Sequence, residues 1–332
     1  MSPSTTMEAV RFHSTGDSSV LQLENNVPIP QIADNEVLIK VEYAGVNFVD
    51  TYQRSGLYPI KLPAVAGREG AGTIVEVGRE VPLSFHLELG DRVAVFAQGT
   101  LAQYVAASAE SILKLPSSVS TRVGAAVMLQ GLTAWTIVRD AHDVQKGQVI
   151  LVQAAAGGTG GLIVQMCKHL GATVIGTVST AQKAEVAKQH GCDHVIIYKE
   201  RDVLTEVLRL TDGKGCHAVL SGIGQSTFAT DLASTRRKGT LVSYGNSSGP
   251  VVSFKILELS KKNIKLVRPT LANYIQEREE FVERTKELLD LLSRNIVSVP
   301  IEKEYMIDQV GHAQDELTGQ KTTGKLVVKI AS

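Results

Sequence analysis

Glycine and alanine residues crowd the segment 154–161, which reads Ala-Ala-Ala-Gly-Gly-Thr-Gly-Gly between an apolar run at 148–153 and a helical pattern at 161–170. Glycine lets the backbone turn sharply and lets a ligand approach without a Cβ in the way. The first N–H groups of the following helix and the positive end of its dipole would then face that ligand. The segment therefore predicts a diphosphate site at Gly157 and Gly160.

The spacing of these residues, Ala154-x-x-Gly157-x-x-Gly160, departs from the G-x-G-x-x-G of many dinucleotide-binding proteins. Its context is nevertheless the one that such sites require, because an apolar strand leads into the turn and a helix leads out. The alternative interpretation is a tight strand-to-helix connection that binds nothing.

The end of the next predicted strand, 173–178, indicates which dinucleotide would bind. NAD-binding proteins usually carry an Asp or Glu about 20 residues beyond the glycine turn, where it binds the ribose 2′-hydroxyl. Here the chain continues Ser179-Thr180-Ala181-Gln182-Lys183, and the first acid is Glu185. Hydroxyl groups and an ammonium suit a 2′-phosphate, which a carboxylate would repel. We therefore expect NADPH as the cofactor, with an ordinary solvated helix lysine as the alternative for Lys183.

The elements that position this turn alternate along the chain. Predicted strands lie at 148–153, 173–178, 194–198, 217–221 and 240–244, and predicted helices at 161–170, 180–190 and 201–211 separate the first four of them. This alternation predicts a parallel sheet with helices on both faces. Residues 7–125 differ, because short strands such as 37–46, 70–77 and 92–96 predict a small barrel-like β domain. Helical patterns at 121–140 and 276–292 and a closing strand at 325–330 complete the chain.

The composition excludes several classes of protein. The 332 residues suggest two domains, and 34 basic and 34 acidic residues leave no net charge that would favour nucleic acid or an anionic membrane. No apolar run approaches the roughly 20 residues of a membrane helix. Residues 1–6 are small and polar, so we expect a disordered extension rather than a secretory signal. Cys167, Cys192 and Cys216 are odd in number and share no C-x-x-C spacing, which favours a reducing, cytoplasmic location.

Several motifs resemble those of one family. Residues 45–59 (GVNFVDTYQRSGLYP) are similar to the signature of the quinone oxidoreductases, the ζ-crystallin-like, zinc-independent branch of the medium-chain dehydrogenase/reductase superfamily. Similar matches occur at 154–160, 176–183, 243–249 and 267–271. The resemblance implies an α/β fold with a Rossmann doubly wound parallel sheet at 127–268. It also implies a discontinuous, β-rich GroES-like catalytic domain at 7–126 and 269–332, with a cleft between the two.

The same resemblance assigns roles to individual residues of this chain. Those expected at the nicotinamide and the quinone are Asn47, Tyr52 and Tyr58. Thr133 would hold the carboxamide, and Gly158 and Thr159 would meet the diphosphate. Those expected around the 2′-phosphate are Ser179, Lys183 and Tyr198. Those expected along the rest of the groove are Ser221, Ile223, Tyr244 and Asn246, with Lys325 reaching back from the last strand. Plain packing is the alternative for the two tyrosines at 52 and 58.

No metal is expected. Zinc members of the superfamily carry Gly-His-Glu and a nearby cysteine, whereas this chain has Gly67-Arg68-Glu69 and Asn47 at those places. Zinc requires about four N, S or O ligands, and the strongest ligand types are missing. Without a Lewis acid, alcohol oxidation is poorly supported, whereas a quinone is itself an electron acceptor. We therefore expect NADPH-dependent reduction of a quinone to a semiquinone or a hydroquinone, with protons from tyrosine hydroxyls or solvent.

Other functions remain open at this point. An NADPH-dependent enal or enone double-bond reductase would use the same cofactor site. The resembled family also includes proteins that bind AU-rich RNA, so nucleic acid is a secondary ligand to consider. A serine hydrolase would use Ser247 in the G-x-S-x-G run 245–249, with Asp308 and His312 downstream, but it needs a helix directly after the serine. The family further implies a homodimer through the edge strand at 264–268.

Overall fold

A computed structural model describes residues 5–319 and 322–330, which divide into two compact units. Unit 1 holds the described residues of Met1–Gln130, Glu277–Lys286 and Val299–Ser332, and unit 2 those of Gly131–Gln276 and Glu287–Ser298. The domain boundaries predicted at 126/127 and 268/269 stay a prediction. Of the predicted N-terminal extension, residues 1–4 lie outside the described part, whereas Thr6 pairs with Pro28 as the first residue of a strand.

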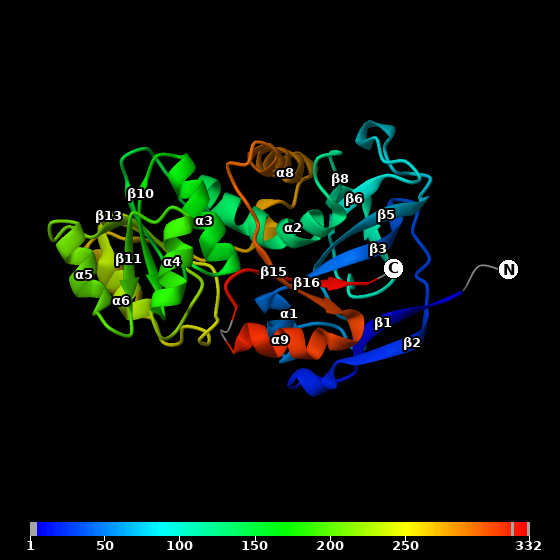
Figure 1. Ribbon diagram of the computed structural model, residues 1–332, viewed down its shortest axis with the longest axis horizontal. Helices are drawn as coiled ribbons and strands as arrows, with labels where there is room; N and C mark the ends of the chain where they lie inside the picture. The colour runs from blue at the N-terminus through cyan, green and yellow to red at the C-terminus, as the bar shows by residue number, and fades with distance from the viewer. Residues whose placement is uncertain (1–4, 320–321, 331–332) are drawn as a thin grey trace. The chain divides into compact units, whose positions relative to one another are not determined.

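Unit 2 is built on six parallel strands in the order β11-β10-β9-β12-β13-β14. The strands are β9 (Val149–Val152), β10 (Thr173–Val178), β11 (His194–Ile197), β12 (Cys216–Ser221), β13 (Thr235–Ser243) and β14 (Lys265–Val267). In chain order this is the 3-2-1-4-5-6 arrangement of a doubly wound sheet, which confirms the predicted Rossmann fold. Central residues such as Leu151, Ile175 and Val219 are fully buried, because helices cover the sheet on both faces (Figure 1).

Helices α3 (Gly158–His169), α4 (Ala181–Gln189) and α5 (Val203–Leu210) follow the predicted alternation, and α2 (Thr121–Thr136) and α8 (Arg278–Ser293) confirm the helical patterns at 121–140 and 276–292. Two further helices, α6 (Phe228–Ser234) and α7 (Leu271–Tyr274), were not predicted. A π-helical turn at Ile137–Ala141 extends α2. Helix α3 begins three residues before the predicted start at 161, because Gly158, Thr159 and Gly160 already belong to its first turn.

Unit 1 is mostly strand, as predicted. Its larger sheet has the order β15-β16-β3-β5-β6-β8, with β7 also paired to β3, and its smaller sheet has the order β2-β1-β4. The strands are β1 (Thr6–Phe12), β2 (Gln22–Pro28), β3 (Glu36–Val46), β4 (Ala64–Val65), β5 (Glu69–Val77), β6 (Arg92–Phe96), β7 (Tyr104–Ser108), β8 (Ile112–Lys114), β15 (Ile301–Met306) and β16 (Lys325–Lys329). The strands predicted at 37–46, 70–77, 92–96 and 325–330 are confirmed.

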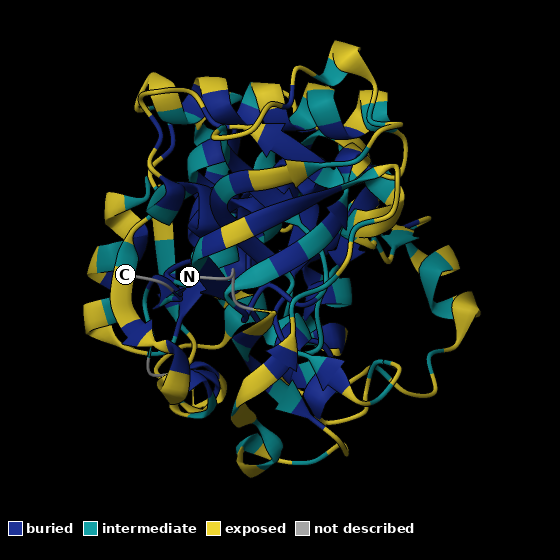
Figure 2. Ribbon diagram, turned by 90° about the vertical axis from the view of Figure 1, so that its right-hand side faces the viewer, coloured by how far each residue is buried: buried dark blue, intermediate teal, exposed yellow. Residues whose placement is uncertain are grey.

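Two helices of unit 1, α1 (Phe48–Arg54) and α9 (Val310–Thr318), were not predicted, and they contact each other. The core of the unit gathers the buried side chains of the sheet, including Ile39, Val41 and Leu326. In Figure 2, the residues coloured as buried lie mostly in the interior, and the exposed ones lie on the outer loops and helix faces. Short 3-10 turns occupy Ser18–Val20, Leu83–Phe85, Ala109–Ser111, Ile256–Lys261 and Ile307–Gln309.

None of the helices formed by residues 5–319 and 322–330 combines the length and the apolar character that a membrane span requires.

Candidate functional site

In unit 1, the predicted site residue Asn47 lies where strand β3 ends and helix α1 begins. It is the N-cap of α1, and its backbone N–H donates a 2.8 Å hydrogen bond to Oδ2 of Asp50, one turn into the helix. An acid at this position satisfies one of the N–H groups that a helix start leaves without a partner. The side chain of Asn47 is therefore presented from a fixed junction, and it is 1% exposed.

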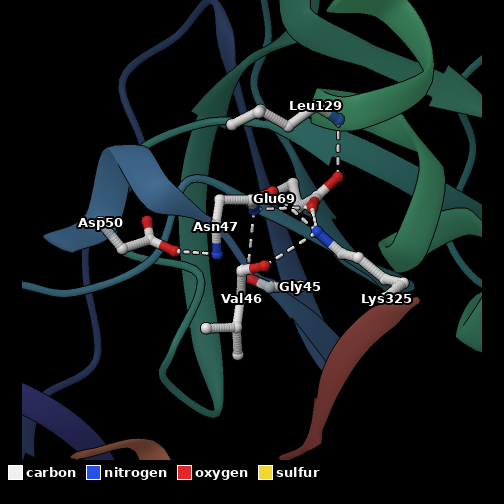
Figure 3. Close-up of polar contacts among 7 residues, drawn as sticks. All are labelled: Gly45, Val46, Asn47, Asp50, Glu69, Leu129 and Lys325. Carbon is white, nitrogen blue, oxygen red and sulfur yellow. Dashed lines mark hydrogen bonds and ion pairs between the residues drawn. The ribbon is translucent and has the colours of Figure 1, made fainter. Parts of the chain in front are cut away.

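Lys325, which the resemblance placed at the cofactor, lies beside Asn47 (Figure 3). Its Nζ donates to Oδ1 of Asn47 at 2.7 Å, to the carbonyl of Val46 at 3.1 Å and to Oε1 of Glu69. The Asn47 amide in turn donates to the same Glu69 oxygen at 2.7 Å. Both sides of the Asn47 amide are thus engaged, which locks its orientation.

Glu69 is the centre of this buried network, and Figure 3 shows the polar groups converging on it. Its second carboxylate oxygen accepts the backbone N–H of Leu129 at 2.6 Å, and its side chain is fully buried. A Cβ on Gly45 would lie 2.2 Å from Oε1 of Glu69, so only glycine leaves room for the carboxylate at this point of β3. The network therefore depends on β3, β5 and β16 being in register.

Asp50 is a second buried acid beside this network. It is 3% exposed, and its Oδ1 has no hydrogen-bond partner among the described residues. Burial raises the pKa of Asp50 to about 7, and the charge of Glu69 raises it further, whereas the Asn47 N–H and the charges of Lys325 and Arg68 lower it. Its protonation therefore changes near neutral pH.

These residues do not fit a zinc ion. The oxygens of Glu69 and Asn47 already face the Lys325 ammonium, whose charge would repel a divalent cation. Asn47 and Arg68 also stand where zinc members of the resembled family carry cysteine and histidine, and neither replaces those ligands. Over residues 5–319 and 322–330, no group of three or more His, Cys, Asp or Glu side chains is arranged to hold a metal.

Tyr52 and Tyr58, the other residues predicted near the quinone, are in contact with each other. Their ring centroids are 5.2 Å apart at an interplanar angle of 63°, an edge-to-face geometry, and both side chains are half-buried. The backbone N–H of Tyr58 donates to the carbonyl of Tyr52 at 3.0 Å, which ties the loop after α1 to the helix. The two rings together form an aromatic surface at the end of α1 and the start of the following loop.

In unit 2, the glycine turn joins β9 to α3 at the carboxyl edge of the sheet. Ala154 has a φ of +53°, and its carbonyl accepts the N–H of Gly157 at 2.9 Å. A Cβ on Gly160 would lie 2.2 Å from that same carbonyl oxygen, so the tight approach of helix and turn requires glycine there. The first N–H groups of α3 thus face the edge where doubly wound proteins bind ligands.

His190 supports this turn from the end of α4. Its Nδ1–H donates to the carbonyl of Ala155 at 3.1 Å, and burial lowers its pKa. A Cβ on Gly161 would lie 2.4 Å from the imidazole. The turn is therefore packed between the sheet and a neutral ring.

The residues predicted around the 2′-phosphate follow two neighbouring strands. Ser179 comes directly after β10, and the Tyr198 N–H, directly after β11, donates to the carbonyl of Val178 at 3.0 Å. Lys183 lies in the first turn of α4, where its backbone N–H donates to the Thr180 hydroxyl at the N-cap. Ser179 and Lys183 are half-buried and Tyr198 is 45% exposed. Hydroxyl and ammonium groups thus occur at one edge of the sheet.

The remaining predicted residues lie further along unit 2. Ser221 ends β12, and its carbonyl accepts the N–H of Tyr244 at 2.8 Å, so the ends of β12 and β13 stay side by side. Ile223 follows in the β12 loop, and its carbonyl accepts the Ser248 N–H at 2.7 Å. Of the other two predicted residues, Asn246 lies in the loop after β13 and Thr133 lies on α2.

The Gly-x-Ser-x-Gly run does not form a nucleophile elbow. Residues 244–255 contain no helix, and Gly249 has a φ of +100° in an irregular loop. A serine hydrolase requires the serine at a sharp turn that leads straight into a helix. The serine-hydrolase alternative is therefore wrong for Ser247.

Sequence reasoning did not single out Glu69 and Asp50 as site residues. Each carries a signal that was available. Glu69 is a charged residue directly before the small and apolar run 70–75, and Asp50 follows Asn47 by three positions, the spacing of a capping acid.

Comparison with known proteins agrees with this architecture. Residues 33–117 match the family described as "Alcohol dehydrogenase GroES-like domain", and residues 158–293 match that described as "Zinc-binding dehydrogenase". The chain is similar to a quinone oxidoreductase of Pseudomonas aeruginosa, 38% identical over 324 residues, which cover 96% of this chain and 98% of that protein.

Two further relatives are informative. The structure of Escherichia coli quinone oxidoreductase complexed with NADPH superposes with a TM-score of 0.93 at 34% identity, covering 97% of this chain and 100% of that one. A 2-haloacrylate reductase from a Burkholderia species is 32% identical over 332 residues, which cover 97% of this chain and 98% of that protein.

Proposed function

This chain belongs to the quinone oxidoreductase family of the medium-chain dehydrogenase/reductase superfamily, and from that premise we propose that it is an NADPH-dependent quinone oxidoreductase. The observation that carries the proposal is the carboxyl edge of the unit 2 sheet. There the glycine turn follows β9, while Ser179 directly follows β10, Lys183 lies in the first turn of α4, and no acid precedes Glu185 in this stretch. Hydroxyl and ammonium groups favour the extra phosphate of NADPH, which a carboxylate would repel.

The residues of unit 2 would hold the cofactor by its phosphates. The N–H groups of Gly158 and Thr159, at the positive end of α3, bind the diphosphate, while Gly157 and Gly160 keep Cβ atoms out of its way. Those that surround the 2′-phosphate are Ser179, Lys183 and Tyr198. Those that line the rest of the nucleotide are Thr133, Ser221, Ile223, Tyr244 and Asn246.

The residues of unit 1 would serve the reaction itself. When bound, NADPH would supply reducing electrons as a hydride from its nicotinamide, and a quinone that gained this hydride and a proton would become a hydroquinone, with a semiquinone as the one-electron alternative. Asn47, fixed by Lys325 and Glu69, provides a rigid wall for the nicotinamide. Tyr52 and Tyr58 offer an aromatic surface for the quinone ring, and their hydroxyls or solvent supply the proton.

A double-bond reductase is the second candidate, favoured by the similarity to the 2-haloacrylate reductase. An activated alkene also accepts a hydride at carbon and a proton at the neighbouring position, so the same cofactor site would serve. The two candidates differ only in the acceptor that fits beside Tyr52 and Tyr58.

A steady-state assay of NADPH and NADH oxidation separates these functions. We expect oxidation of NADPH with 9,10-phenanthrenequinone or 1,4-benzoquinone and little with an alkenal, and spin detection reports whether a one-electron product is released. Oxidation of NADPH with the alkenal alone would favour the double-bond reductase. Activity with neither acceptor would contradict both.

We also propose that the chain forms a homodimer through unit 2. Strand β14 pairs with β13 and with no other strand among the described residues, so one edge is open. Exposed apolar side chains precede it, with Val252 64%, Ile256 77% and Leu257 80% exposed. An open edge beside exposed apolar residues favours pairing with a second copy about a twofold axis. A cytoplasmic location stays a prediction, supported by three buried, unbridged cysteines.

A further inference from the structure

A connected series of buried polar side chains lies beneath the glycine turn of unit 2. It starts at Asp231 on α6, which is 1% exposed, and passes to Gln153, directly after β9, which is 4% exposed. The Gln153 Nε2 donates to Oδ1 of Asp231 at 2.6 Å. The Gln153 Oε1 accepts the hydroxyl of Thr177 on β10, so three elements are joined by side chains alone.

Thr177 connects this series to the first residue of the turn. Its Oγ1 accepts the backbone N–H of Ala154 at 3.3 Å, and its carbonyl accepts the N–H of Ala155 at 3.0 Å. Ala154 has a φ of +53°, in the left-handed region that costs a residue with a Cβ about 1–2 kcal/mol. Such a conformation persists only where its surroundings impose it. The hydroxyl of Thr177 is one of the groups that impose it.

The opposite side of Asp231 faces the loop after β12. Its Oδ2 accepts the Thr227 hydroxyl at 2.8 Å, and the Thr227 oxygen lies 3.4 Å from the hydroxyl oxygen of Ser221, within hydrogen-bond distance. The Ser221 hydroxyl in turn accepts the N–H of Ile223 at 3.4 Å. Asp231 is therefore hydrogen-bonded to groups beneath both loops that would hold the cofactor.

Burying the Asp231 carboxylate costs folding free energy, and a purely structural role would not require a charged group at this position. No lysine, arginine or histidine within residues 5–319 and 322–330 pairs with Asp231, so neutral donors alone compensate the buried carboxylate. Burial accordingly raises its pKa. Buried polar groups of this kind are stable only when each partner is satisfied and oriented, which makes them rigid.

We infer that Asp231, Gln153 and Thr177 are positioning residues for the diphosphate turn. Asp231 fixes the Gln153 amide, Gln153 fixes the Thr177 hydroxyl, and that hydroxyl holds Ala154 in the conformation that aims the following N–H groups at the diphosphate. The inference rests on the proposed function, because it assumes that NADPH binds at this turn. It adds that the turn is preorganised by side chains that never touch the cofactor.

The most selective test compares substitutions of two buried threonines. Thr177→Val removes the hydroxyl with little change in volume, and Thr177→Ser retains it. The matched control is Thr211→Val. Thr211 is 8% exposed, and its hydroxyl likewise accepts a backbone N–H, from Gly215 at 2.9 Å, and donates onward, to the carbonyl of Val207 at 2.7 Å. Thr211 follows α5 before β12 begins, at the amino edge of the sheet and away from the turn.

Two measurements report on these variants. One is the dissociation constant of NADPH, by titration of its fluorescence. The other is the hydrogen exchange of the amides of 154–161 without NADPH. We expect Thr177→Val to raise the dissociation constant by about tenfold, since a net hydrogen bond is lost. We expect Thr177→Ser and Thr211→Val to stay within about twofold of the wild type. Exchange at the turn should be faster in Thr177→Val alone.

The inference is overturned if Thr177→Val binds NADPH as tightly as the wild type. It is also overturned if Thr177→Ser is as defective as Thr177→Val, or if Thr211→Val weakens binding equally. Asp231→Ala, where it folds, should reproduce the effect of Thr177→Val on both measurements. A wild-type chain that binds no NADPH would instead contradict the proposed function, and the inference would fall with it.

Discussion

The Nζ of Lys325 donates a 2.7 Å hydrogen bond to Oδ1 of Asn47, although 278 positions separate the two residues in the chain. The contact follows from the register of unit 1, because β16 pairs antiparallel with β3 and places Leu326 opposite Val46. The start of the last strand therefore lies beside the end of β3, where helix α1 begins. With Glu69, which also bonds to both residues, the pair forms a fully buried charged network.

Replacing Lys325 with methionine should lower the free energy of unfolding by about 3–5 kcal/mol, because Glu69 would remain as a buried charge without its partner. The double variant Lys325→Met/Glu69→Gln should recover part of that loss, since no buried charge is left alone. Urea denaturation followed by circular dichroism measures both. Equal stability of the single and double variants would show that the charge pairing does not matter.

The stability of the wild type should depend on the titration of Asp50. Its pKa is about 7 in the folded chain, against an ordinary value of 3.8, so between these values the folded state binds more protons than the unfolded state. Stability should therefore fall as pH rises through this window, by at most about 1.4 kcal/mol per pH unit. Asp50→Asn removes this slope. Urea denaturation at pH 5, 6, 7 and 8 measures the free energy of unfolding of the wild type and of Asp50→Asn. A difference between the two free energies that does not change with pH would contradict the prediction.

Gly160→Ala should weaken NADPH binding by about tenfold or more and lower the melting temperature, because its Cβ would lie 2.2 Å from the Ala154 carbonyl oxygen and force the turn to shift. Gly311→Ala is the control. It lies in α9, where a Cβ would meet its nearest neighbour at 3.4 Å, an ordinary contact. Fluorescence titration and thermal unfolding report the two effects. Normal NADPH binding by Gly160→Ala would disprove the steric argument.

The open edge of the cofactor sheet yields a prediction about assembly. Leu257→Glu should shift the chain from dimer to monomer in light scattering after size exclusion, because a charge would replace an apolar side chain that is 80% exposed in the turn preceding β14. Leu83→Glu is a matched control, since Leu83 is 94% exposed in unit 1. A wild type that is monomeric, or a Leu257→Glu variant that stays dimeric, would contradict the proposed contact.

The parts of this molecule that the sequence predicted are those with a strong local pattern. Strand β3 and the succession β9, α3 and β10 follow from hydrophobic periodicity and from the glycines between them. Strand β13 was predicted too short, since it begins at Thr235 and includes the charged Arg236, which periodicity treats as loop. Helix α1 was missed because the apolar strand pattern runs directly into its short sequence. In each case, pairing or packing with distant residues decided the structure.

The candidate site was predictable only in part for a related reason. Motif resemblance placed Asn47 and Lys325 at the cofactor, but nothing local indicates that they bond to each other and that both bond to Glu69. The connection of Asp231 to Thr177 was equally hidden, because it depends on the order of strands in the sheet. Long-range polar networks of this kind become visible only when the fold brings their members together.

The selection of the 2′-phosphate should depend on the end of β10 and the start of α4. Lys183→Ala should weaken NADPH binding by about tenfold and leave NADH binding unchanged, because only NADPH carries the phosphate that the ammonium would bind. Ser179→Asp should weaken NADPH binding further through repulsion. Lys188→Ala is the control, since Lys188 is an exposed residue of the same helix that pairs with Glu185 at 2.7 Å.

The most direct test of the account compares the dissociation constants of NADPH and NADH for the wild-type chain at one ionic strength. We predict that NADPH binds at least about tenfold more tightly, because hydroxyl and ammonium groups replace the acid that NAD-binding proteins place on the ribose. Equal affinities, or tighter binding of NADH, would contradict it.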